Sequence, residues 1–348
     1  MQFGVQFFPD VRPEEKSSAI YFEECLSLAA EAEAFGFTHS RMVEHYFHYY
    51  GGYSPNPLVF LAALAQRTRK MRLITGALLP VFSNPLKMAG EIAMVDALSN
   101  GRLDVGFARA FLPHEFRRFG ISPNESVQRF REGVRQIDRL LREKNVTDRG
   151  EFLTIENTTS LPRPTQQPRP KFYVAALNTP DSFEFAGRSG HSIMAIPIAG
   201  GRMRELTGIY RKAWRDAGHP GNGEVMLAFH MYCEPDGDSA RRTAKPFIEG
   251  YFRSLVDAAS DWLSGTSSAD YPGYESIMAK LKSTTMENQI EGKSAWIGSP
   301  AELRQTLSGL VDEFGPIDHA SLQINFNLLP FEKTMDSLKL FASEVMPK

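Results

Sequence analysis

The amino-acid sequence predicts an α/β protein of the (β/α)8 class, the TIM barrel, with an insertion before the last strand. Eight short apolar segments alternate with helical segments, and each helix is long enough for a right-handed crossover between parallel strands. Several strands end in small or charged residues, as barrel strands do at a binding face. We therefore expect a single domain over residues 1–348, with the insertion at about 257–299.

The first four strands are delimited by turn residues and helix caps. A helix with apolar residues at helical spacing follows the first strand and ends at Gly36, the glycine position that closes many helices. Asn56 and Asn84, each followed by proline, are typical of residues that begin helices. Asn100 and Gly101 end the next helix. These strands are predicted at residues 3–8, 37–43, 72–79 and 102–107.

The second half of the chain supplies four more strands and the less regular segments. The strands are predicted at residues 172–177, 191–196, 224–233 and 319–325, and the helices at 125–144, 180–189, 202–217 and 332–345. A proline-rich stretch at 149–171 is expected to run over the surface. The insertion is rich in Gly, Ser and Pro, which is typical of either a mobile lid or a disordered surface loop.

Composition excludes several classes of function. The net charge is −2 and no basic run is present, which argues against binding to nucleic acid. No apolar run approaches the ~18 residues of a membrane span, and the chain begins directly with a predicted strand rather than a signal segment. Two isolated cysteines, Cys25 and Cys233, are typical of a reducing compartment, so we expect a cytoplasmic protein. The 25 Phe residues suit an apolar pocket as well as a core.

Two neighbouring strand ends carry groups that suit a phosphate. Thr179 and Pro180 begin a helix directly after the fifth strand, and Ser182 places a hydroxyl in its first turn. A helix N-terminus offers free N–H groups and the positive end of a dipole, and Arg109 at the end of the fourth strand supplies a cation. The alternative is that Thr179 only caps a helix.

Glu44 and His45 follow the second strand and face the same end of the predicted barrel. A histidine there is either a proton donor and acceptor or a structural residue. A metal site is not expected, because no HxH or HExxH pattern is present and His39 lies at the other end of the strand.

Other catalytic motifs are missing or incomplete. Glu44 as a glycosidase acid would need a second carboxylate at another strand end, and Glu115 and Asp104 are poorly placed for that role. We expect Glu44 instead to orient its loop. No GxGxxG follows the first strand and no Walker loop is present, so Rossmann and P-loop functions are not indicated.

Several stretches, in order along nearly the whole chain, carry a family resemblance. They are VEHYF with GGYSPNP, RLITGALLPVFSNPLKMAGEIAMVDALSNGRLDVGFARAFLPHEFRRFG, LNTPDSFEFAGRSG, WIGSPAEL and LKLFASEVMP. The sequence thereby resembles the bacterial luciferase-like flavin-dependent monooxygenases. The resemblance implies a TIM barrel with an insertion, often mobile, before the last strand. It also implies reduced FMN, or in another branch a deazaflavin, bound at the carboxyl face of the barrel.

The resemblance also implies roles for single residues. His45 matches the catalytic histidine, and Tyr46 stands where the family motif has a second histidine. Ala108 replaces the reactive cysteine of luciferase itself, which weakens an expectation of light emission. The cofactor-binding residues that the resemblance implies are Gly76 and Ala77 as a non-proline cis peptide beside the flavin ring, and Asn178, Thr179, Ser182 and Arg109 near the phosphate.

The implied reaction is a two-component monooxygenation. A separate flavin reductase supplies FMNH2, O2 forms a flavin peroxide or hydroperoxide, and a dry apolar pocket preserves that adduct until it oxidises an organic substrate. The resemblance also implies a homodimer through helices at 57–68 and 85–99. Two alternatives remain open: a deazaflavin-dependent oxidoreductase on the same scaffold, and a non-catalytic flavin-binding protein.

Overall fold

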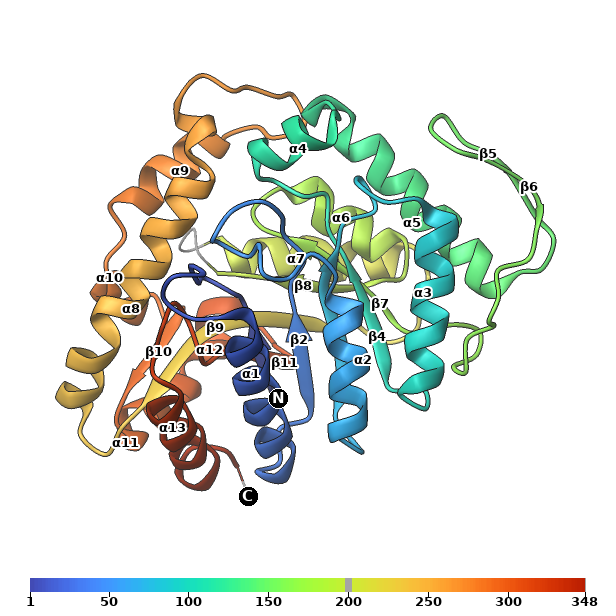
Figure 1. The fold of residues 1–348 in the computed structure, drawn as a ribbon. Coiled ribbons are helices and arrows are strands. Elements are labelled where there is room, and N and C mark those ends of the chain that lie inside the picture. The colour runs from blue at the N-terminus through green and yellow to red at the C-terminus, as the bar shows by residue number, and fades with distance from the viewer. Residues whose placement is uncertain (198–201, 348) are drawn as a thin grey trace.

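The computed structural model describes residues 1–197 and 202–347 and has a closed barrel of eight parallel strands at its centre (Figure 1). Around the barrel the order is β1, β2, β3, β4, β7, β8, β9 and β11, and the pairing of β11 with β1 closes the ring. The predicted barrel is confirmed. The strands are β1 (Gln2–Phe7), β2 (His39–Met42), β3 (Arg72–Leu78), β4 (Leu103–Phe107), β7 (Phe172–Ala176), β8 (Ser192–Ala195), β9 (Val225–Cys233) and β11 (His319–Gln323).

Helices surround the barrel, and those at 57 and 85 begin where the sequence predicts, whereas the helix at Pro113–Phe119 lies in a segment where none was predicted. The side chains of Asn56 and Asn84 accept hydrogen bonds from the N–H groups of Leu58 and Leu86, and a proline fills the first helical position each time. These helices are α1 (Ser18–Ala34), α2 (Pro57–Arg67), α3 (Pro85–Leu98), α4 (Pro113–Phe119), α5 (Ser126–Arg142), α6 (Pro180–Arg188), α7 (Met203–Asp216), α8 (Gly237–Ala258) and α13 (Phe331–Glu344).

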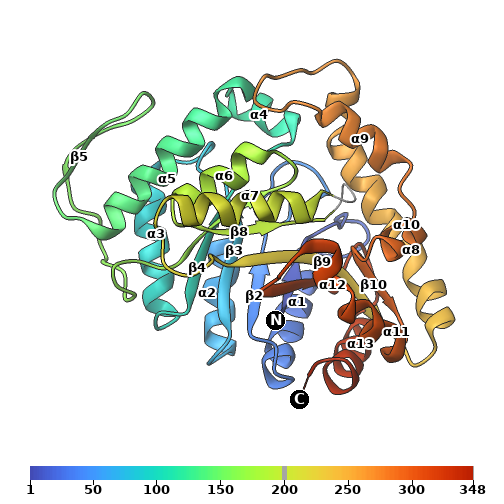
Figure 2. The same ribbon diagram turned by 180° about the vertical axis from the view of Figure 1, so that it is seen from behind.

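The proline-rich stretch contains structure that the sequence did not predict. It includes β6 (Thr154–Thr158), which pairs with β5 (Val146–Arg149) as an antiparallel hairpin at the side of the barrel opposite α8 (Figure 1 and Figure 2). The carboxylate of Glu132 in α5 accepts hydrogen bonds from the N–H groups of Glu151, Phe152 and Leu153. These bonds anchor the hairpin turn to α5. The alternation of buried and exposed residues in β5 is only four residues long. A pattern this short, next to a proline-rich stretch, does not predict a strand.

The insertion is largely helical. It contains η2 (Ser260–Leu263), α9 (Tyr274–Lys282), α10 (Met286–Glu291) and β10 (Ala295–Gly298), which precede α11 (Pro300–Ser308) and α12 (Leu310–Phe314). β10 pairs in parallel with the last four residues of the long strand β9, outside the barrel ring. The sequence did not predict this ninth strand, because its four residues form a strand only through the extra length of β9. The segment between η2 and α9, orange in Figure 1, arches toward α4.

Buried side chains fill part of the barrel interior. A buried cluster of Ile74, Ala77, Tyr173, Met194 and Met226 lies between the strands. The two cysteines are free and buried. None of the helices in residues 1–197 and 202–347 is both long and apolar enough to cross a membrane.

Candidate functional site

A cavity opens at the carboxyl ends of the strands, where TIM barrels bind their ligands. It holds about 1110 Å³ of space not filled by protein atoms, open solvent at its mouth included. Six of the seven residues expected to be catalytic or to bind the cofactor line it: His45, Gly76, Ala77, Arg109, Thr179 and Ser182. The seventh, Asn178, lines an adjoining outer pocket. The barrel thus brings together residues that lie up to 137 positions apart (45 to 182).

His45 is held by a buried carboxylate. Its Nδ1 lies 3.0 Å from Oε1 of Glu115, whose side chain in α4 is fully buried. The same oxygen accepts from the backbone N–H of Tyr46 at 2.8 Å, which fixes the carboxylate against the loop. The imidazole packs between the rings of Phe8 and Phe111. With Nδ1 as donor to Glu115, a neutral ring keeps Nε2 able to accept a proton.

Glu44 makes a separate pair on the other side of the loop. The hydroxyl of Tyr46 donates to its Oε1 at 2.5 Å, and the N–H of Leu79 donates to Oε2 at 3.3 Å. Burial raises the pKa of Glu44 to about 8. The side chain therefore fixes its loop to β3, the role expected from sequence, although it also lines the cavity.

The Gly76–Ala77 peptide bond in β3 is cis, the geometry that the resemblance implies. The register of β3 against β4 shifts between Thr75 and Leu78, so this peptide bond lies outside the regular strand pairing. Both of its residues line the cavity. Glycine is required at position 76, because a Cβ there would come 2.2 Å from Cγ of Arg41.

Arg109 connects the end of β4 with the insertion. Its Nη1 donates to the carbonyl of Asp270 at 2.9 Å, and its guanidinium lies 5.0 Å from the ring centroid of Tyr271. The carboxylate of Asp270 accepts from the Ser126 hydroxyl and the Val127 N–H at the start of α5. These contacts hold the insertion over the cavity mouth.

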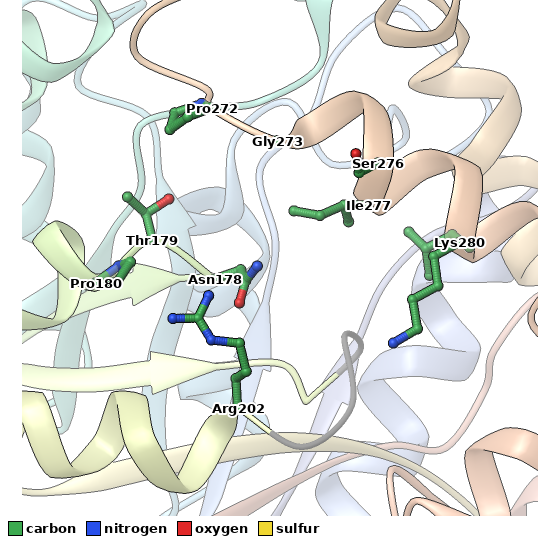
Figure 3. A pocket seen from close by; sticks show the side chains of 10 residues that line it. Asn178, Thr179, Pro180, Arg202, Pro272, Gly273, Ser276, Ile277 and Lys280 are labelled. Carbon is green, nitrogen blue, oxygen red and sulfur yellow. The ribbon is translucent and has the colours of Figure 1, made fainter.

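Two polar side chains, those of Asn178 and Thr179, lie at the start of α6. Thr179 occupies the N-cap position with an extended backbone, as predicted, but its side chain makes no capping hydrogen bond. The Oδ1 of Asn178 is buried and has no hydrogen-bond partner among the described residues. Both residues face Ile277 of α9 and Arg202 across the outer pocket (Figure 3). Thr179 lines both hollows, so the outer pocket adjoins the cavity there.

Sequence reasoning missed four residues of the site. Glu115 was set aside as poorly placed, yet α4 folds back and brings it to His45 rather than to Glu44. Its place a few residues after the fourth strand was the signal in the sequence. The insertion supplies Tyr274 and Met278 to the cavity wall, and β2 supplies Arg41. Among the residues that the structure describes, no group of three or more His, Cys, Asp or Glu side chains is arranged to hold a metal.

Comparisons with known proteins agree with this geometry. The family model described as luciferase-like monooxygenase matches residues 1–315. The oxygenase component of a flavin-dependent trigonelline monooxygenase from Acinetobacter baylyi is 37% identical over 198 residues, 55% of this chain and 54% of that protein. The match therefore spans about half the length of that relative.

Solved structures extend the likeness to the whole chain. The monooxygenase RslO1 from Streptomyces bottropensis has a TM-score of 0.86 at 40% identity, over 99% of this chain and 98% of that one. The oxygenating constituent of 3,6-diketocamphane monooxygenase from Pseudomonas putida, a type II Baeyer–Villiger monooxygenase in complex with FMN, has a TM-score of 0.81 at 20% identity. It covers 99% of this chain and 97% of that one, and at this identity it shows the fold alone.

A family model that covers most of the chain and a full-length structural match point to the same conclusion as the barrel, its insertion and its carboxyl-face cavity. The chain belongs to the luciferase-like monooxygenase family.

Proposed function

We propose that this protein is the oxygenase of a two-component flavin-dependent system, which uses reduced FMN and O2 to oxidise an apolar organic substrate. The observation that carries the proposal is the set of residues at a single cavity. It combines the His45–Glu115 pair, the cis Gly76–Ala77 peptide, and the Arg109, Thr179 and Ser182 side chains.

The residues present fit FMN. Arg109 and the hydroxyls of Thr179 and Ser182 are donors of the kind that bind phosphate, and the first turn of α6 adds the positive end of its dipole. The unpartnered Oδ1 of Asn178 suits a ribityl hydroxyl. The cis peptide at Gly76 and Ala77 offers a backbone surface for a flat ring.

The chain's own groups have three tasks in the proposed reaction. Reduced FMN would supply two electrons to O2, so that one oxygen atom enters the substrate and the other leaves as water. Nε2 of His45 accepts or returns a proton, while Glu115 stabilises the charged ring. Phe8, Phe111 and Leu79 give the cavity an apolar wall that excludes water. Arg109 and its contacts to Asp270 and Tyr271 keep the insertion closed over the mouth as a lid.

Partners follow from the same proposal. No nicotinamide-binding motif is present in the sequence, so a separate flavin reductase must deliver FMNH2. The Acinetobacter relative is the oxygenase component of its system, which supports this. We also propose a homodimer through α2 and α3, where Val59, Met94 and Leu98 expose more than half of their surface. A cytoplasmic location suits the two free, buried thiols.

The experiment is a cofactor titration followed by a product screen. The protein is titrated anaerobically with reduced FMN and with reduced deazaflavin F420, and the bound cofactor is identified by its absorbance. The complex is then mixed with 18O2 and a panel of aromatic and aliphatic substrates, and products are analysed by mass spectrometry. Binding of FMNH2 with 18O in a product supports the proposal.

Two other outcomes would contradict it. Selective binding of the deazaflavin, with dehydrogenated products free of 18O, identifies a deazaflavin-dependent oxidoreductase instead. Tight FMN binding with no product and no faster consumption of O2 identifies a non-catalytic flavin-binding protein.

A further inference from the structure

Arg41 lines the cavity from within β2 and is almost completely buried, with 4% of its surface exposed. Its aliphatic part packs directly on Gly76. Its guanidinium donates to the side-chain oxygen of Gln6 and, at 3.5 Å, to the sulfur of Met194. Both of these partners line the same cavity.

No countercharge accompanies this cation. Within residues 1–197 and 202–347, no carboxylate oxygen lies within 4.0 Å of Arg41, and both of its acceptors are neutral. Its Nε is buried and has no hydrogen-bond partner there. Burial lowers the pKa of Arg41 to about 10, so the side chain still carries its charge at neutral pH.

Such an arrangement is rare when it serves the fold alone. Arginine is almost never fully buried without an anionic partner, because the desolvation of the charge is then uncompensated. Two partly buried arginines follow that rule: Arg72 reaches the carboxylate of Asp104, and Arg169 reaches that of Asp138. Arg41 instead lines the cavity, and its Nε donates no hydrogen bond to any described residue.

We propose that Arg41, held by Gln6, forms a buried subsite for a negatively charged oxygen of the organic substrate, a carboxylate or a phenolate. The planar guanidinium presents donors in a fork that matches such a group. The Nε2 of Gln6 donates in turn to the Oε1 of Gln323 at 3.4 Å, and this orientation directs the side-chain oxygen of Gln6 at Arg41. This inference rests on the proposed function, because the substrate has to share the cavity with FMN.

The anion at Arg41 is not the flavin phosphate. Among the phosphate candidates, Arg109 follows β4, and Thr179 and Ser182 lie at the start of α6, whereas Arg41 lies within β2 and packs on Gly76. One other source of the same chemistry is the reduced flavin ring, which loses a proton near neutral pH. The experiment must therefore separate a substrate anion from a flavin anion.

The test compares benzoate with its neutral analogue benzamide by isothermal titration calorimetry at pH 7, with and without FMN. The wild-type protein should bind benzoate about 10- to 100-fold more tightly than benzamide, the range for charge-assisted hydrogen bonds in a buried site. Arg41→Met should abolish that preference, and Arg41→Lys should retain part of it. Arg142→Met, which removes an exposed arginine on α5, should leave it unchanged.

A second arm measures the affinities of oxidised and reduced FMN for the same variants. Unchanged affinity for reduced FMN in Arg41→Met, together with loss of the benzoate preference, supports the substrate subsite. A 10-fold weaker affinity for reduced FMN with the benzoate preference intact assigns Arg41 to the flavin and overturns the inference. Absence of any benzoate preference in the wild-type protein overturns it without reference to a variant.

The two arms also separate this inference from the proposed function. If the wild-type protein binds neither form of FMN but keeps the benzoate preference, the flavin function fails and the anion subsite stands. The melting temperature of the ligand-free Arg41→Met protein gives an independent readout. It should stay level or rise, because an uncompensated buried charge has been removed, whereas a structural arginine would lower it.

Discussion

The contact between His45 and Glu115 can be tested by a substitution that removes only charge. The N–H of Tyr46 points at the Oε1 of Glu115 that also meets His45, so Glu115→Gln must turn its carbonyl oxygen to that position. The hydrogen bonds and the ring orientation are then preserved. The other carboxylate oxygen, Oε2, is buried and has no hydrogen-bond partner in the part of the chain that the structure describes, so the amide nitrogen of the variant loses no bond seen there.

The expected effect on turnover follows from this geometry. A hydrogen bond to a charged group contributes about 1.5–3 kcal/mol and a neutral one about 0.5–1.5 kcal/mol. The carboxylate therefore stabilises a protonated His45 by about 1–1.5 kcal/mol more than the amide does. Turnover should fall by about 5- to 15-fold in Glu115→Gln, whereas His45→Ala, which removes the proton acceptor, should lower it by about 10²–10⁴.

The assay measures product formed per FMNH2 oxidised, with a substrate from the screen described above, in a double-mutant cycle. In the His45→Ala background, Glu115→Gln should change turnover by less than about twofold, because its charge no longer has a partner. FMN affinity should stay within a few-fold in all variants. Equal losses from Glu115→Gln in both backgrounds would refute the reasoning, since Glu115 would then act only through the fold.

Three further predictions concern the cofactor, the assembly and the stability. Arg109→Ala should weaken FMN affinity by about 2–3 kcal/mol, measured by fluorescence titration, and an affinity equal to that of Arg142→Ala would remove Arg109 from the site. Met94→Glu on α3 should convert a dimer to a monomer in sedimentation velocity, whereas Val311→Glu, at an equally exposed apolar residue on α12, should leave the dimer intact. A wild-type protein that is monomeric at micromolar concentration would contradict the proposed dimer. Burial raises the pKa of Glu44 to about 8 from 4.5, so the folded protein keeps a proton that the unfolded chain releases. The free energy of unfolding should therefore fall as pH rises from about 4.5 to about 8. Urea unfolding of Glu44→Gln should lack this decrease, and an unchanged pH dependence would show that Glu44 does not titrate in that range.

The local sequence determined the eight barrel strands and several helix starts, although not that of α4. Strands of a parallel barrel are apolar runs between turn residues, and the Asn-Pro pairs at 56–57 and 84–85 mark helix starts by their own hydrogen bonds and backbone angles. Both signals lie within a few residues, so no knowledge of distant contacts is needed. The positions of His45, Arg109 and Thr179 at strand ends followed from the same pattern.

Only the tertiary structure decided which of these residues have partners. Glu115 meets His45 because α4 folds back over the loop after β2, a contact between residues 70 positions apart. Arg41 faces a cavity without a countercharge only because the barrel closes and brings β1, β3 and β8 around it, and the insertion covers Arg109 through Asp270. Charge compensation and burial depend on contacts between distant segments of the chain. The sequence by itself therefore determined which residues stand at the strand ends, and the closed barrel determined the electrostatics of the site that they form.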